Sequence, residues 1–171
     1  MKPGVWQRLD VIARSTVPAF SVFVLLLIGL LPYSIPKLAD VTPALTLMAV
    51  FYWSVNRPDL MTGLTAFTLG LIQDLLTGLP LGVSSLVFLL VQSASANQGR
   101  FFYNKAFTVL WWGFAIVSGP AFLLQWLFSS ALTGALLPFQ PLVISYLITA
   151  GMFPLVAWVL VRIQNGLLRN F

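Results

Sequence analysis

The chain has 171 residues, of which 59% are hydrophobic and only 8% are charged, and its formal net charge is +5. Soluble domains are about 45–50% apolar and about 25% charged, so this composition excludes an ordinary soluble domain and indicates an integral membrane protein. Cysteine, histidine and glutamate are absent, which removes thiol nucleophiles, disulfides, Cys or His metal sites and the usual neutral-pH general base. We therefore expect no catalytic group, no metal and no cofactor.

Six apolar runs predict an all-α bundle that forms one transmembrane domain over residues 1–171. Each membrane-spanning helix needs roughly 20 apolar residues to cross a hydrocarbon core of about 30 Å. The predicted spans cover residues 15–31, 41–55, 60–76, 81–96, 107–128 and 142–161. The connection between the third and fourth spans is so short that these two helices must form an antiparallel hairpin.

Lysine and arginine predict the orientation of the bundle. With the N-terminus in the cytoplasm, one side holds Lys2, Arg8, Arg14, Arg57, Arg100, Lys105, Arg162 and Arg169. Only Lys37 lies on the other side, so the positive-inside rule favours cytoplasmic N- and C-termini. Because these basic residues are dispersed at the ends of apolar runs, they predict membrane orientation and no nucleic-acid partner.

The inner membrane interface is predicted to hold a set of aromatic and basic anchors. These are Trp6, Trp53, Arg57, Trp111 and Trp112. Tryptophan is enriched at the depth of the lipid headgroups. Before the first span, Val5, Leu9 and Ile12 have the spacing of a short helix lying on the inner surface, although a frayed basic tail explains this segment equally well.

The third predicted span carries small residues and one acid on a single face. Ala66, Gly70 and Asp74 recur every four residues, and Gly63 precedes them by about one turn. Such a face permits close approach of another helix. Asp74 is the only acid inside an apolar run, and a carboxylate at mid-bilayer costs roughly 2.5–3.5 kcal/mol. We therefore expect Asp74 to point toward protein.

Three interpretations of Asp74 remain open from the residues alone. It could accept hydrogen bonds from the backbone or hydroxyl of Thr77 in the turn that follows, it could contact a partner helix or subunit, or it could bind a substrate or ion. We predict that the hairpin and its outer turn form a partner-facing surface. Its candidate residues are Gly63, Ala66, Gly70, Asp74, Gly78, Pro80 and Gly82. Gly70→Leu should block close helix approach, and Asp74→Ala should weaken the complex or the fold.

The fourth predicted span has its own polar stripe, made by Ser85, Gln92 and Ala96. Two interpretations are open for it. The stripe could pack on the third helix through interhelical hydrogen bonds, or it could line a small cavity.

One block of the sequence resembles a known family. In order, the block contains Trp53, Arg57-Pro58, Gly70, Asp74-Leu75-Leu76, Gly78 and Pro80-Leu81-Gly82. This order is similar to that of the bacterial rod shape-determining MreD family, and the chain length, six spans and cytoplasmic termini agree. The block covers about a fifth of the chain, and the rest matches only in hydropathy.

The resemblance implies a non-enzymatic protein of the bacterial cytoplasmic membrane. Members of this family belong to the elongation machinery, the rod complex, that supports lateral peptidoglycan synthesis and rod shape. The implied direct partner is the bitopic protein MreC. Through the complex the implied partners are MreB, RodA and a class B penicillin-binding protein, with membrane lipids around them. The implied architecture is similar to the substrate-binding subunit of energy-coupling-factor transporters.

Two other functions are carried as alternatives. A vitamin-binding transporter subunit would need a polar cavity that reaches the external side, with Asp74, Gln92, Gln125 and Gln140 as candidate lining residues. A membrane enzyme or proton-coupled carrier would depend on Asp74 for turnover.

Overall fold

The computed structural model describes residues 5–31, 41–102 and 106–168, and every regular element in these ranges is an α-helix. The helices are α1 (Val5–Gly29), α2 (Leu45–Asn56), α3 (Gly63–Thr77), α4 (Val83–Phe102), α5 (Phe107–Thr133) and α6 (Phe139–Leu168). The predicted all-helical architecture with six helices is therefore confirmed.

The helix boundaries differ from the predicted spans, and three of the differences are large enough to change the interpretation. Val5–Gly29 is one continuous helix, so residues 5–14 are neither a separate surface helix nor a frayed tail. Residues 41–44 are not helical, because a residue that precedes proline, here Thr42, is disfavoured in the helical region. The long loop expected at 129–141 shrinks to 134–138, since α5 continues to Thr133 and α6 begins at Phe139.

Two described helices are long and apolar enough to cross a bilayer by length and hydropathy: α5, and α6 over Phe139–Gly166. Thr16–Gly29, α2 and α3 are apolar but shorter than 18 residues. These two helices are compatible with a membrane protein.

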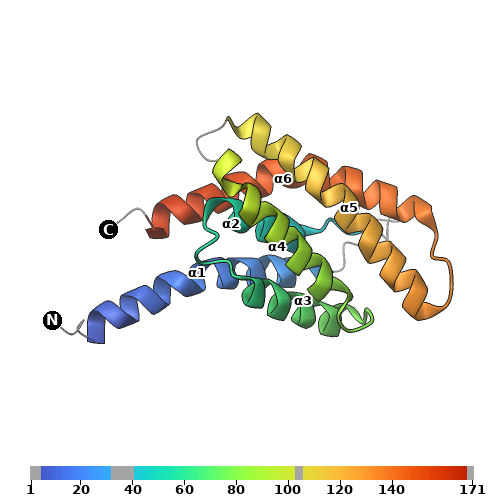
Figure 1. Ribbon diagram of the computed structural model, residues 1–171, viewed down its shortest axis with the longest axis horizontal. Coiled ribbons are helices and arrows are strands. Elements are labelled where there is room, and N and C mark those ends of the chain that lie inside the picture. Colours follow the sequence, from blue (N-terminus) through green and yellow to red (C-terminus); the bar gives the residue numbers. More distant parts are fainter. Residues whose placement is uncertain (1–4, 32–40, 103–105, 169–171) are drawn as a thin grey trace.

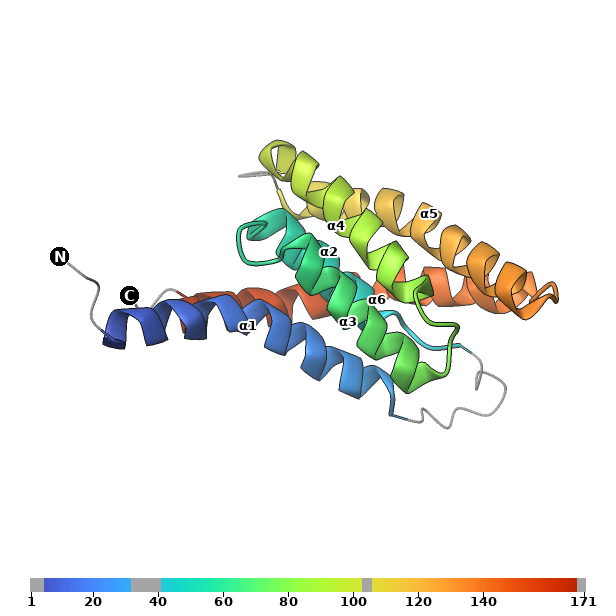
Figure 2. The ribbon, with the colours of Figure 1, turned by 60° about the horizontal axis from the view of Figure 1, so that its bottom comes forward.

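Figures 1 and 2 show that the helices alternate in direction. The start of α1 and the end of α6 lie at one end of the bundle. The opposite end, called here the distal end, holds the α3–α4 turn and the α5–α6 connection.

Helix α2 is the central element: all residues from Leu45 to Val55 are buried, and α2 packs against α1, α4, α5 and α6. Helix α3 lies at the periphery, against α4 and, over a smaller contact, α1.

Aromatic side chains fill the core around α2. Phe114 of α5 and Phe153 of α6 stack with ring centroids 4.3 Å apart, and Phe51 of α2 meets both rings edge-on at 5.4 and 5.9 Å. Such pairs add to the free energy of apolar burial. This cluster joins the central helix to the two longest helices.

Trp53, one of the predicted interface anchors, lies inside the bundle. Its side chain has no exposed surface, and its indole Nε1 donates a 2.9 Å hydrogen bond to the Ser21 hydroxyl of α1. A buried indole needs such an acceptor. Trp53 therefore links α1 to α2 inside the bundle and has no surface left to face lipid headgroups.

Candidate functional site

The small residues of α3 face α4 of the same chain. A Cβ atom added to Gly70 would lie 2.5 Å from the Cα of Ser85 and 2.6 Å from its backbone nitrogen. At Gly63 the added atom would meet only the tip of Leu89, at 3.0 Å. Ala66 is fully buried. The predicted partner-helix face is thus occupied internally, and the backbones of α3 and α4 approach most closely at Gly70.

Asp74 caps the start of α4 from the neighbouring helix. Its Oδ2 accepts a hydrogen bond from the backbone N–H of Gly82 at 2.9 Å. The Ser84 N–H donates to Oδ1 at 3.1 Å and to Oδ2 at 3.2 Å. The first N–H groups of a helix have no partner within the helix, and Asp74, which is fully buried, supplies one for them.

This geometry selects a structural role for Asp74 in the turn, but with donors other than the expected one. The Thr77 hydroxyl donates to the Gln73 carbonyl at 2.7 Å instead of to Asp74. The two N–H donors come from the residues that open α4. A side chain of α3 therefore fixes where α4 begins, and this explains why the acid lies one turn before the hairpin connection.

The turn itself depends on two glycines with left-handed backbone conformation. Gly78 ends α3 with φ of 71°, and Gly82 precedes α4 with φ of 99°. A side chain is strained at such φ values. Between them, the Pro80 carbonyl accepts a hydrogen bond from Val83 N–H. The sequence-predicted residues from Gly63 to Gly82 therefore form one connected structural unit.

The polar stripe of α4 packs against the hairpin, as the first interpretation has it, but among the described residues no hydrogen bond joins Ser85 or Gln92 to α3 itself. Ser85 lies against Gly70. The Gln92 amide Nε2 donates a 3.0 Å hydrogen bond to the Met61 carbonyl, just before α3. Gln92 therefore ties α4 to the α2–α3 connection and does not line a cavity.

A different face of α3 is uncovered. Leu64, Phe67, Leu71 and Leu75 follow one another at spacings of three or four residues, which places them on one side of the helix. Their exposed fractions are 75%, 37%, 36% and 64%. We call these four residues the open face of α3.

The remaining predicted anchors have mixed positions. The Trp111 indole donates to the Ala150 carbonyl at 2.8 Å, so it joins α5 to α6, whereas Trp112 is 60% exposed. The Trp6 side chain lies outside the described residues. Arg57 makes two 3.2 Å hydrogen bonds to the carboxylate of Asp59 in the α2–α3 connection.

These bonds from Arg57 are the main reason that the pKa of Asp59 is lowered. The pair is exposed, so its contribution to stability is small. Its position next to Pro58 agrees with a local ion pair in the turn.

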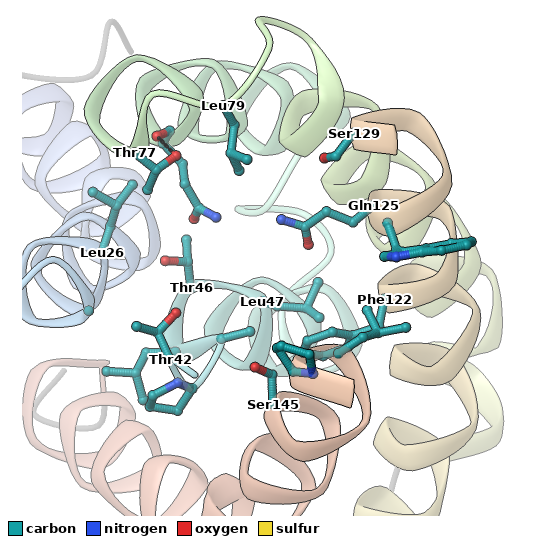
Figure 3. Close-up of a pocket in the computed structure, with 18 of the residues that line it drawn as sticks. Leu26, Thr42, Thr46, Leu47, Thr77, Leu79, Phe122, Gln125, Ser129 and Ser145 are labelled. Atoms are coloured by element: carbon teal, nitrogen blue, oxygen red, sulfur yellow. Dashed lines mark hydrogen bonds between the residues drawn. The ribbon is translucent and has the colours of Figure 1, made fainter. Parts of the chain in front are cut away.

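A cavity of about 470 Å³ opens at the distal end, above the start of α2. Figure 3 shows Thr46, Gln125, Ser129 and Ser145 around it, on α2, α5 and α6. Of the four residues expected in a polar cavity, only Gln125 lines this one. Asp74 and Gln92 hold the hairpin, and Gln140 is exposed outside the cavity lining.

Sequence reasoning missed Thr46, Gln73 and Ser129 as cavity residues. Gln73 lies about 100° from Asp74 around α3, and this rotation directs it toward the cavity while Asp74 faces α4. A polar residue inside an apolar run was the available signal for Gln73. Thr46 and Ser129 carry no such signal, because single hydroxyls are common in membrane helices.

Comparison with known proteins supports one family. No curated protein and no solved structure gives a significant match. The sequence model of the family described as rod shape-determining protein MreD matches residues 11–164, which is nearly the whole chain. This is an inner-membrane, shape-determining family and not a known enzyme family. The extent of the match confirms the resemblance seen in the hairpin block: the chain belongs to the MreD family.

Proposed function

We propose that this protein is a non-enzymatic subunit of the rod complex that binds the single-span protein MreC through the open face of α3. The family gives the cellular role, which is the determination of rod shape at the inner membrane. The observation that supports the docking site is the combination of a short helix, a peripheral position and an uncovered apolar face.

The length of α3 is the first part of the argument. Its 15 residues extend about 22 Å at 1.5 Å per residue, less than the hydrocarbon core of about 30 Å. A helix that is too short for the bilayer thins the bilayer around it or associates with other helices. A longer partner helix laid along α3 would replace the poorly matched lipid.

The second part is the shape of the open face. Lipid tails are as apolar as leucine, so association between membrane helices depends on packing. Leu64, Phe67, Leu71 and Leu75 form a continuous row that a partner helix can pack against. The small-residue stripe is unavailable for this purpose because α4 covers it.

The hairpin residues then act on partner binding indirectly. Gly70 sets the distance between α3 and α4, and Asp74 fixes the start of α4. Together they hold the open face in one orientation. In this proposal the N- and C-termini are cytoplasmic, and MreC connects the protein to MreB, RodA and a class B penicillin-binding protein in lateral peptidoglycan synthesis.

The test truncates side chains of the open face and leaves the core unchanged. A triple variant, Leu64→Ala, Leu71→Ala and Leu75→Ala, removes side chains that are exposed in the isolated chain. We expect the protein to accumulate in the membrane at normal levels and to recover at least about tenfold less MreC in a mild-detergent pull-down. Cells that depend on the variant should lose rod shape.

The matched control carries the same chemical change on other helices. Leu123→Ala, Leu147→Ala and Leu155→Ala alter side chains of α5 and α6 that are 51%, 61% and 66% exposed. This control should recover MreC normally. If both triple variants retain wild-type recovery of MreC and support rod growth, the docking site is not on α3. If wild-type protein recovers no MreC, direct binding itself is wrong.

A further inference from the structure

The distal cavity contains buried polar groups that have no partner. Thr46 is 6% exposed and Ser129 is 4% exposed, and among the described residues no hydrogen bond engages the hydroxyl of either side chain. The Gln73 Oε1 atom is also buried without a hydrogen-bond partner. Figure 3 shows Thr46 and Ser129 on opposite sides of the cavity. Buried polar groups are nearly always hydrogen-bonded in proteins, so the buried Gln73 oxygen points to a missing partner, and the Thr46 and Ser129 hydroxyls lie at the same cavity.

Non-helical backbone also lines the cavity. Residues 42–44 line the cavity without being helical, and α2 begins there with no side-chain cap. The first N–H groups of a helix need partners from outside it. Two such groups are satisfied, since Ala44 N–H donates to the Thr149 hydroxyl at 3.1 Å and Leu45 N–H donates to the Pro43 carbonyl at 2.9 Å. Non-helical backbone at membrane depth is tolerated where it lines a cavity, and this segment fits that rule.

The chemistry of the walls restricts what can bind. Among the residues that the structure describes, none that lines the cavity is ionisable under physiological conditions. The polar groups are amides and hydroxyls, including Gln125 and Ser145, and the apolar walls include Leu47, Phe122 and Trp126. Charged ligands are usually recognised by side chains of opposite charge, which are absent from this lining. The volume of about 470 Å³ lies within the range of about 300–1,000 Å³ that is typical for small-molecule sites.

We propose that the distal cavity binds one uncharged amphiphile: hydroxyl or amide groups of its head bond to Thr46, Gln73, Gln125 and Ser129, while its apolar portion lies against the walls. Such a head occurs in a neutral membrane lipid and in a free small molecule. The proposal does not depend on MreC, because the cavity and the open face of α3 share no residue.

The first experiment identifies the occupant of the full-length protein. The protein is purified from membranes in mild detergent, measured by native mass spectrometry, and extracted with organic solvent for chemical identification. We expect one uncharged adduct per chain. A lipid source gives an adduct that survives dialysis and is recovered in the solvent extract, whereas a free small molecule is lost on dialysis and returns when the dialysate is added.

Isosteric variants assign the adduct to the cavity. Thr46→Val combined with Gln125→Met removes hydrogen-bonding groups and retains the shape of the side chains. We expect adduct occupancy to fall at least about tenfold, while the adduct-free protein keeps its thermal stability. Ser95→Ala is the control, because Ser95 is also fully buried and unpartnered but lies outside the cavity lining. An adduct that is retained in the double variant, or that carries a charged head, overturns the proposal.

A second measurement covers the case in which the occupant is lost during purification. Because the chain has no cysteine, Ser129→Cys introduces a single thiol into the cavity. Octyl glucoside, used below its micellar concentration as an uncharged amphiphile, should slow modification of this thiol by a methanethiosulfonate at least about fivefold. Octyl sulfate should not slow it, and exposed Ser93→Cys serves as the lipid-facing control. Absence of both an adduct and this protection overturns the proposal.

Discussion

The α3–α4 contact and the distal cavity lie at the same end of the bundle and use similar residues in opposite ways. At Gly70 the two backbones leave no room for even a methyl group, whereas the cavity beside Gln73 holds about 470 Å³. In the contact, the polar group that matters, Asp74, has every donor it needs. In the cavity, the Gln73 Oε1 atom is buried without a hydrogen-bond partner. The same α3 segment therefore places one polar side chain, Asp74, in a fully paired structural contact and the next one along the chain, Gln73, with an unpaired oxygen beside a cavity.

The largest effect should come from adding one methyl group at the contact. Gly70→Ala places a Cβ atom 2.5 Å from backbone atoms of α4, so the helices must separate. We expect a loss of about 3 kcal/mol in the free energy of unfolding, at the upper end of overpacking effects, measured in mixed micelles. Gly63→Ala is the control: it meets only a flexible leucine tip and should lose less than about 1 kcal/mol. Equal losses would show that the approach at Gly70 is not tight.

The next effect concerns the cap on α4. Asp74→Ala leaves the N–H groups of Gly82 and Ser84 without an acceptor, and each unsatisfied buried group costs about 1–3 kcal/mol. Because the bond from Gly82 is only part-buried, we expect a loss of about 2 kcal/mol in the unfolding free energy and faster proteolysis at the hairpin turn. Asp74→Asn retains one acceptor oxygen and should lose roughly half as much. A fully stable Asp74→Ala protein would exclude the capping role.

Removing a single hydroxyl should have a smaller effect on stability, and the effect on ligand occupancy should differ between the contact and the cavity. Ser85 is buried against Gly70 with an unpartnered hydroxyl, so its small size matters and its polarity does not. Ser85→Ala should change the unfolding free energy by less than about 0.5 kcal/mol and should leave ligand occupancy unchanged. Ser129→Ala should be equally neutral for stability but should reduce occupancy of the cavity. A drop in stability without a change in occupancy would make Ser129 merely structural.

The smallest effect is expected outside both regions, in the α2–α3 connection. The hydrogen bonds from Arg57 lower the pKa of Asp59 below its usual 3.8. A lowered pKa stabilises the fold above about pH 4, and this contribution is lost as the pH falls through the folded-state value. Asp59→Asn should therefore change the unfolding free energy by less than about 1 kcal/mol at pH 7, with the same result at pH 5.5. A larger pH dependence over this interval would need another titrating group.

The sequence predicted the helical class and the hairpin because these depend on local patterns. Hydropathy and the spacing of Ala66, Gly70 and Asp74 are visible along the chain. The sequence did not show which helix packs on this face, because a face of small residues accepts a helix of the same chain as well as a helix of another protein. The burial of Trp53 was also hidden, since interface tryptophans and buried ones have the same neighbours in sequence.

The cavity could not be predicted for a different reason. It is lined by residues of all six helices, including Phe88 of α4, and by the non-helical residues 42–44 before α2. Only Gln125 was expected there, as a possible polar lining residue. The tertiary arrangement, and not any local pattern, brings Thr46 and Ser129 to the same space.

The cap that Asp74 places on α4 also bears on how the chain enters the membrane. As α3 leaves the ribosome, its carboxyl group has no donors, because Gly82 and Ser84 follow it by eight and ten residues. An unpaired carboxylate opposes insertion of α3 alone. Once α4 has been synthesised, the two helices can neutralise this penalty together. The translocon should therefore release α3 and α4 into the bilayer as a pair. Asp74 alone would then determine that α3 waits for α4 during insertion.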